Sequence, residues 1–250
     1  MALQREFKTQ GDYLFKNRSY LPILFLLVGL AVLLYGEDTE PVQIEEIHID
    51  LYKFVCLTIS LLGLLIRIFT VAHTPKNTSG RNTMEGQLAD ELNTTGMYSL
   101  VRHPLYLGNF FMWLSVGMLT ENFWFTIAFV LLYWLYYERI MYVEENFLID
   151  KFGDRYLVWA RHTPAFVPSF KNYVNPKYSF CILKVLKKEK NGLAAIFLIF
   201  WLFDWAGSQF ETRTLHIYFD FWFYAAITST TIYLILKVMK KKNMLTETNT

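Results

Sequence analysis

The stretch LYKFVCLTISLLGLLIRIFTVA, residues 51–72, decides the fold. A helix needs roughly 20 mostly apolar residues to cross the hydrocarbon core of a bilayer. The charged residues in this stretch are Lys53 and Arg67, and both lie near its ends, where long side chains reach the headgroups. The stretch is therefore predicted to be a transmembrane helix.

Five further apolar blocks occur along the chain, and together with residues 51–72 they predict six transmembrane helices. Of the 250 residues, 54% are hydrophobic and 18% are charged, whereas a soluble domain carries about 25% charged residues. A buried core helix of a soluble protein explains one such block but not six. We predict an all-α polytopic membrane protein in which residues 1–250 form a single membrane domain. The five blocks are Tyr20–Gly36, Leu105–Leu119, Asn122–Tyr137, Gly192–Ala206 and Ile217–Leu236.

Positive charge is distributed unevenly between the two sides of the predicted membrane. The chain has 24 Lys and Arg residues, and the loops on one side hold all of them except Lys53, Arg67 and Arg213. Loops rich in Lys and Arg stay in the cytoplasm, so both termini are predicted to be cytoplasmic. The net charge of +2 conceals this asymmetry and gives no reason to expect a nucleic acid partner.

Most polar residues that could form a functional site lie in two stretches predicted to be cytoplasmic, residues 74–108 and 138–168. They flank a helical hairpin whose helices are joined by a short turn near residues 120–122. Because the two helices are neighbours, we expect the two stretches to lie close together.

The first stretch ends in Arg102-His103-Pro104, at the start of the third predicted helix. Proline suits the first turn of a helix, where its missing N–H is not needed. Arg102 fits a positive anchor at the membrane surface as well as a functional role. His103 fits either a histidine that bonds a backbone carbonyl or a titratable functional group.

The second stretch begins with charged residues at the end of the fourth predicted helix: Glu138, Arg139, Glu144 and Glu145. An ordinary solvated helix end would carry such charges. If the helix continues to Lys151, however, the apolar residues 147–149 keep one face buried, and a carboxylate beside that face would suit a cationic ligand. The segment after Gly153, up to Pro168, predicts a short helix and then an irregular segment that is either a linker or a lid.

The strings TGMYSLVRHPLYLGN (95–109) and EENFLIDKFGDRYLVWARHTPAFVPS (144–169) together resemble the isoprenylcysteine carboxyl methyltransferase family of membrane methyltransferases. Phospholipid methyltransferases share parts of this pattern. The resemblance covers residues 92–168. Residues 78–83 and 92–96 look closer to bacterial members, which include enzymes that methylate a phosphate of lipid A.

The resemblance implies a site for S-adenosylmethionine (SAM) in residues 92–168. Residues 192–238 add two transmembrane helices outside this core, and we expect them to form part of a lateral opening for a lipid. Glu144 would hold the cationic part of the cofactor. The residues that would line the cofactor are Leu92, Asn93, Tyr98, His103, Pro104 and Tyr106.

SAM carries its own reactive methyl group, so the protein has to align the reactants and exclude water. An anionic nucleophile needs a positive group to place it, for which Arg139 and Arg102 are candidates. An amine nucleophile needs a proton acceptor, for which Glu145 and Glu138 are candidates. The cytoplasmic arginines favour O-methylation of an anionic lipid group, such as a lipid A phosphate or a prenylcysteine carboxylate.

One departure from the family pattern concerns the arginine. Eukaryotic members have an arginine four residues before the first acid of the pair, where this chain has Ile140 and places Arg139 one residue earlier. One residue rotates a side chain by about 100° around a helix. Arg139 is therefore in doubt as the equivalent residue.

The partners expected from the sequence are the lipid bilayer and a membrane lipid or lipidated substrate, in a bacterial inner membrane with the active site facing the cytoplasm. Cys56 and Cys181 do not have the spacing of a metal site, and no metal is expected. Two alternatives remain. An NADPH-dependent membrane sterol reductase has a similar motif but differs at Leu105 and Asn109. A non-catalytic transporter or assembly protein would need polar residues at the midplane, where none are found.

Overall fold

The computed structural model describes residues 2–36, 46–75, 89–212 and 216–245, and within these ranges the secondary structure is entirely helical. Each of the six apolar blocks forms a helix. Residues 76–88 lie outside the described residues. They include 78–83 and part of the polar stretch 74–108. The helices are α1 (Ala2–Asn17), α2 (Leu21–Tyr35), α3 (Glu46–Ala72), α4 (Met97–Leu100), α5 (Pro104–Met118), α6 (Phe123–Phe152), α7 (Asp154–His162), α8 (Ile182–Thr212) and α9 (Phe221–Lys241).

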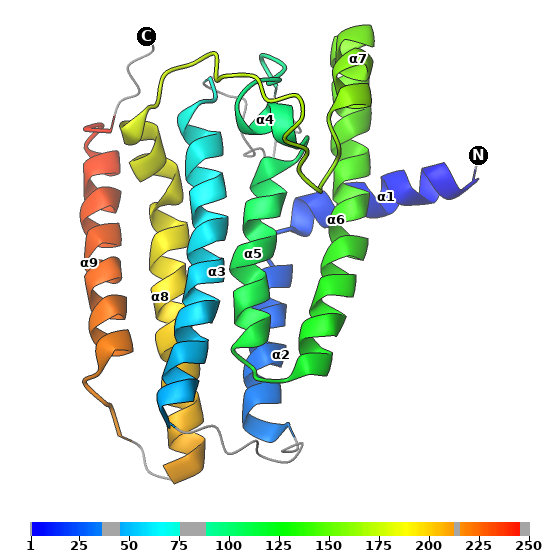
Figure 1. The fold of residues 1–250 in the computed structure, drawn as a ribbon. Coiled ribbons are helices and arrows are strands. Elements are labelled where there is room, and N and C mark those ends of the chain that lie inside the picture. The colour runs from blue at the N-terminus through cyan, green and yellow to red at the C-terminus, as the bar shows by residue number, and fades with distance from the viewer. Residues whose placement is uncertain (1, 37–45, 76–88, 213–215, 246–250) are drawn as a thin grey trace.

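The long helices form one bundle (Figure 1). Across the view in Figure 1, α9, α8, α3, α5 and α6 follow one another, α2 lies behind α5, and α1 crosses α6. The helices α4 and α7, the start of α5 and the second half of α6 gather at one end of the bundle, which we call the motif end. The two polar stretches of the sequence therefore meet at this end, as predicted.

Three described helices are long and apolar enough to cross a membrane: Asp50–Ala72, Ile182–Phe210 and Phe221–Lys241. The helices α1 and α2 pass the same test only as a pair, bent by 78°. Large apolar side chains also cover the outside of the bundle, as expected where lipid replaces water. These features show a helical membrane protein. The count of six spans and the cytoplasmic position of both termini remain predictions.

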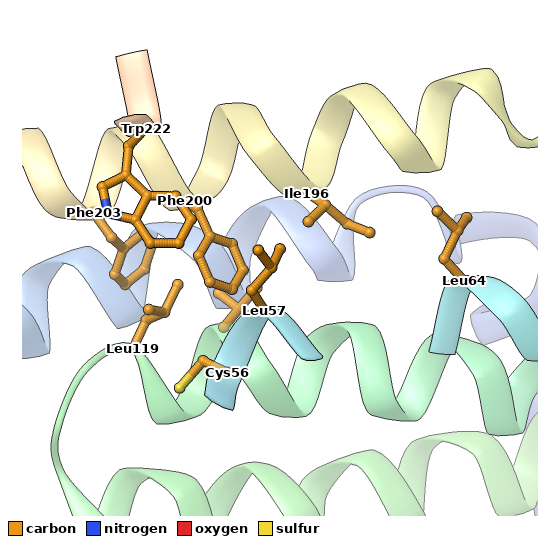
Figure 2. Packing of buried hydrophobic residues seen from close by; sticks show 9 residues of the cluster. Cys56, Leu57, Leu64, Leu119, Ile196, Phe200, Phe203 and Trp222 are labelled. Atoms are coloured by element: carbon orange, nitrogen blue, oxygen red, sulfur yellow. The ribbon is translucent and has the colours of Figure 1, made fainter. Parts of the chain in front are cut away.

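The core lies between α3, α5, α8 and α9 and is built from aliphatic and aromatic side chains. Figure 2 shows Phe200, Phe203 and Trp222 lying close to Leu57 and Leu119. The α3–α5 contact is especially close, since a Cβ atom built on Gly63 would lie 2.4 Å from the carbonyl oxygen of Gly108. Small residues let membrane helices approach in this way. This contact fixes α5, which begins with the RHP motif, against the core.

The α5–α6 hairpin is set by local capping. The side chain of Asn122 accepts a hydrogen bond from the N–H of Phe125 at 2.9 Å, which satisfies one free donor at the start of α6. The helix then runs on to Phe152, well beyond the apolar block that ends at Tyr137, so the condition of a helix that continues to Lys151 is met. Gly153 ends it with φ +55°, a conformation that glycine adopts readily, and α7 starts in a new direction. The paired acids consequently lie on a rigid helix beside the start of α5.

Candidate active site

The loop from α4 to α5 is held by the extended segment that follows α7. The backbone N–H groups of Arg102 and His103 donate to the carbonyls of Pro164 and Ala165 at 2.8 and 3.3 Å. Farther along the segment, the N–H of Ser169 donates to the carbonyl of Leu100 at 2.9 Å. We call residues 163–176 the strap. Its hydrogen bonds to the motif place it across the motif end, consistent with the lid that the sequence allowed.

The motif loop meets the acidic pair of α6 through a network of charged groups. Nη1 of Arg102 lies 2.9 Å from one oxygen of Glu145, and Nε2 of His103 lies 2.9 Å from the other. The hydroxyl of Tyr106 donates to Glu144 at 2.5 Å, and Nδ1 of His103 lies 3.6 Å from Glu144. We call these five side chains the acid cluster. It joins the two polar stretches of the sequence into one site.

The charge state of the acid cluster follows from its geometry. Burial opposes protonation of His103, whose side chain is 6% exposed, but its hydrogen bonds with Glu144 and Glu145 raise the pKa of the imidazole above its ordinary value. Burial also opposes ionisation of Glu145, yet the hydrogen bond from His103 and the charges of His103 and Arg102 lower the pKa of this carboxyl. Glu145 is therefore an ionised carboxylate held by two cations.

Glu144 differs from its neighbour in accepting a short hydrogen bond from a neutral phenol, while Nδ1 of His103 lies farther away, at 3.6 Å. It accepts the hydrogen bond from Tyr106, and its side chain is 22% exposed. Tyr98 lies close enough for the Glu144 charge, together with burial, to raise the pKa of the Tyr98 phenol. A carboxylate can accept several hydrogen bonds. A carboxylate that is flanked by aromatic rings and can accept further hydrogen bonds suits a cationic ligand.

The structure places the predicted cofactor residues at the motif end, although not all of them in the acid cluster. His103, Tyr106 and Glu144 belong to the cluster, and Pro104 is buried as the first residue of α5. Leu92 and Asn93 are half-buried on the segment that leads into α4. Within the described ranges, no group of three or more His, Cys, Asp or Glu side chains is arranged to hold a metal ion.

Arg139, which the sequence put forward for substrate binding, is not in the acid cluster. Its Nε donates to Gln10 of α1 at 2.8 Å, and its guanidinium lies 4.9 Å from the ring centroid of Phe7. The next residue, Ile140, is fully buried. The one-residue step along α6 has thus rotated the arginine away from the buried face and onto α1. Glu138, the other proton acceptor considered, is 43% exposed beside Arg139.

Sequence reasoning missed a column of tyrosines below the acid cluster. The ring of Tyr137 lies 4.6 Å from that of Tyr106 and 4.2 Å from that of Tyr133. The hydroxyl of Tyr133 donates to the backbone carbonyl of Tyr106 at 2.7 Å. The spacing of four residues between Tyr133 and Tyr137 places them on one helix face and was the available signal.

The tyrosine column forms one end of an apolar groove between α2, α5 and α6, with a volume of about 190 Å³. Its far part is aliphatic and aromatic, and Leu24 and Leu132 on its rim are exposed on the outside of the bundle. The groove therefore opens on the outside of the bundle, and its lining residue Tyr137 contacts Tyr106 of the acid cluster. Its lining residues are Pro22, Leu24, Phe25, Val28, Trp113, Phe125, Ala128, Phe129, Leu132, Tyr133, Tyr136 and Tyr137.

This position differs from the one expected for the lateral opening. The sequence interpretation assigned part of the opening to residues 192–238, which form much of α8 and α9. Of these helices, α8 packs on α3 and α9 packs on α8, and neither lines the groove. They instead brace the site, because Glu189 of α8 binds Arg67 of α3 at 2.8 and 2.9 Å, and Arg67 in turn donates to Asn109 of α5 at 2.6 Å.

Comparison with known proteins identifies relatives for the part of the chain that forms this site. Residues 53–155 match the model of the phospholipid methyltransferase family. The protein-S-isoprenylcysteine O-methyltransferase of Schizosaccharomyces pombe is 40% identical over 78 residues, which are 31% of this chain and 33% of that protein. The cobalt-zinc-cadmium resistance protein CzcN of Cupriavidus metallidurans is 37% identical over 90 residues, 36% and 41% of the two chains.

A plant relative gives a longer match. Protein-S-isoprenylcysteine O-methyltransferase B of Arabidopsis thaliana is 33% identical over 115 residues, 45% of this chain and 57% of the relative. The matches thus span between a third and somewhat more than half of these relatives. No solved structure matches the chain. The matched family segment includes most of α3, all of α5 and α6, and the whole acid cluster.

Proposed function

We propose that the chain is a membrane methyltransferase that transfers a methyl group from SAM to the headgroup of a lipidic substrate. Residues 53–155 match the phospholipid methyltransferase family, which confirms the resemblance seen in the motifs. The observation that carries the proposal is the contact between Tyr106 of the acid cluster and Tyr137, which lines a groove that opens on the outside of the bundle. A lipid tail in the groove would bring its headgroup to the cluster.

The residues at the motif end fit SAM chemically. When bound, SAM supplies a methyl group on a positively charged sulfur. Glu144 would hold a positive part of the cofactor, and Tyr106 orients this carboxylate by donating to it at 2.5 Å. Tyr98 and Tyr106 offer aromatic rings beside the same carboxylate, a combination that attracts cations. Leu92 and Asn93 are proposed to complete the cofactor site.

The state of Glu145 supports an anionic nucleophile. An amine headgroup would need a proton acceptor, and a general base works best when its pKa lies near the operating pH. The charges of Arg102 and His103 lower the pKa of Glu145 and so make it a weak base. A carboxylate or phosphate headgroup needs no base. We therefore propose O-methylation of a prenylcysteine-type carboxylate or of a lipid A phosphate.

The proposed topology has six spans, α2, α3, α5, α6, α8 and α9, with both termini in the cytoplasm. The bend of 78° between α1 and α2 supports it, since α1 lies along the membrane surface if α2 crosses the membrane. The motif end is then cytoplasmic. The host membrane is proposed to be a bacterial inner membrane.

Calorimetry on detergent-purified protein tests the cofactor. We expect wild-type protein to bind SAM with a micromolar dissociation constant. Loss of a charged hydrogen-bond partner costs roughly 1.5–3 kcal/mol, so Glu144→Gln should weaken binding about 10- to 100-fold. His103→Ala should weaken it too, whereas Glu138→Gln, an exposed acid on the same helix, should not. Binding of NADPH without any response to SAM would overturn the proposal and favour the reductase.

Transfer of radioactive methyl from SAM then separates the headgroups. The probes are S-farnesylcysteine with a free carboxylate, lipid A with its phosphates, and phosphatidylethanolamine with an amine. We expect a labelled carboxylate or phosphate. Exclusive labelling of the amine would contradict O-methylation but leave the methyltransferase proposal standing.

A further inference from the structure

Large apolar side chains are exposed along the strap, at the motif end of the bundle. Val167 is 73% exposed and Phe170 is 76% exposed, although both lie in a segment without regular structure. The strap contains a single charged residue, Lys171. Exposed apolar side chains that gather in one segment mark an interaction surface. The exposed members are Val167, Phe170, Tyr173 and Val174.

The strap dips beside the long helices of the bundle. Figure 1 shows it descending from α7 along α6 before it turns back to α4. The ring of Phe166 lies 5.7 Å from that of Phe110 and 5.5 Å from that of Trp134. Phe110 lies beyond Pro104, the first residue of α5, by about 9 Å along the helix axis. The strap thus reaches past the start of α5 toward the middle of the bundle.

Both ends of the exposed stretch contact side chains that face the outside of the bundle. Trp134, which Phe166 contacts, is exposed on α6. Shortly after the strap, the ring of Phe180 lies 6.3 Å from that of Phe69, which is exposed on α3. Lipid tails cover such apolar faces in a membrane protein. The exposed side chains of the strap therefore continue the lipid-facing surface of α3 and α6.

The strap backbone is compatible with the level of the lipid headgroups. An irregular backbone within the hydrocarbon core would leave polar groups unsatisfied. Pro164 and Pro168 have no N–H to satisfy, and the N–H of Ser169 donates to the carbonyl that ends α4 at 2.9 Å. Tyr173 belongs to a residue type that is enriched at the headgroup level, and the exposed Lys171 can extend its ammonium group to lipid phosphates.

We propose that the strap is a membrane-contact surface whose exposed apolar side chains insert at the boundary between the headgroups and the acyl chains. The proposal rests on the proposed topology, in which α5 and α6 cross the membrane. Interfacial segments bury their apolar side chains roughly 5–10 Å into this boundary, which matches the depth that Phe166 reaches. Because the strap also binds the backbone of Arg102 and His103, the bilayer holds the loop that carries the motif.

Spin labels in nanodiscs of phosphatidylcholine and phosphatidylglycerol test the contact. Each label is attached to one introduced cysteine, in a background of Cys181→Ser; Cys56 is fully buried. Power saturation compares access of oxygen, which concentrates in lipid, with access of a nickel chelate, which stays in water. The test positions are Val167→Cys and Phe170→Cys, where the exposed side chains leave room for a label.

We expect Val167→Cys and Phe170→Cys to favour oxygen about as strongly as Leu131→Cys, a control on the exposed face of α6. Asp150→Cys, an exposed position near the end of α6, should favour the nickel chelate. Preference for the nickel chelate at both strap positions would overturn the proposal. Low access to both reagents would show that protein, such as a second copy of the chain, covers the strap, and would overturn it as well. If Leu131→Cys favours the nickel chelate, the topology fails and the proposal with it.

Hydrogen exchange in the same nanodiscs tests whether the bilayer holds the motif loop. The variant combines Val167→Ser with Phe170→Ser, and the matched control is Ile235→Ser, an exposed apolar position on α9. We expect the double variant to exchange about tenfold faster at Arg102 and His103, because losing the insertion of a large apolar side chain favours local opening. Equal rates in the double variant and the control would refute the anchoring role. Neither readout requires SAM or methyl transfer, so a failure of the proposed enzymatic function is seen separately.

Discussion

Replacing Gly63 by alanine tests whether the close α3–α5 contact positions the site. The new Cβ would lie 2.4 Å from the carbonyl oxygen of Gly108 and 2.8 Å from the backbone nitrogen of Met112. Carbon–oxygen contacts between packed helices are normally about 3.3–3.6 Å, so the helices must separate by about 1 Å. Both close atoms are backbone, which a side-chain rotation cannot move.

The magnitude follows from two opposing effects. Alanine favours a helix over glycine by about 1 kcal/mol, and overpacking costs typically 1–3 kcal/mol. With two backbone clashes we expect Gly63→Ala to lower the free energy of unfolding by about 1–2 kcal/mol. Gly207→Ala is the control, since a Cβ there meets nothing within 4 Å, and it should be neutral or stabilising.

The assay is denaturant unfolding of purified protein in detergent micelles, followed by SAM binding of the folded variants. Because α5 begins with the motif loop, a shift of α5 should also weaken SAM binding in Gly63→Ala. The reasoning is refuted if Gly63→Ala is as stable as Gly207→Ala and binds SAM like the wild type.

Three further predictions concern charged groups. The pKa of His103 is raised, so its pairing stabilises the fold below about pH 6.5, and this stabilisation is lost as the pH rises through the raised pKa. The pKa of Glu145 is lowered, so its pairing stabilises the fold above about pH 4.5, and this stabilisation is lost as the pH falls through the lowered pKa. The melting temperature should fall on the alkaline side in wild type but not in His103→Gln, and an equal fall in both would contradict this. Arg139→Ala should keep SAM binding and methyl transfer and cost about 0.5–1 kcal/mol of stability, the value of an exposed cation–π contact; a large drop in kcat would restore Arg139 as a substrate residue. Glu189→Gln should destabilise the protein by about 3 kcal/mol in the same unfolding assay, because the substitution removes the carboxylate that pairs with Arg67 and the Glu189 side chain is only 5% exposed. A change under about 1 kcal/mol would argue against the bracing role.

The role of α8 and α9 follows from this bracing contact. The two helices lie beyond the matched family segment, yet Glu189 reaches Arg67 and, through it, Asn109 on the helix that starts with the motif. Through this contact α8 supports α5. The expectation that residues 192–238 form part of the lipid opening stays a prediction.

The helices, and the end of the bundle at which the two polar motifs meet, could be predicted from the sequence. Long apolar blocks form helices in a membrane because every backbone polar group has to be satisfied within its own segment. Proline at the start of α5 and the apolar residues after the acidic pair likewise act locally, so the helix start at Pro104 and the extension of α6 to Phe152 could be predicted. The short turn brought the two motifs to the same end.

The tertiary structure alone decided which side chains meet. Glu145 binds Arg102 across 43 positions of sequence, and the direction of Arg139 depends on α1, which packs against α6 from the other end of the chain. The groove takes its walls from α2, α5 and α6, which meet only in the folded bundle. Hydropathy and helical period describe each segment by itself, whereas the rotation of a helix and its neighbours depend on contacts between distant segments.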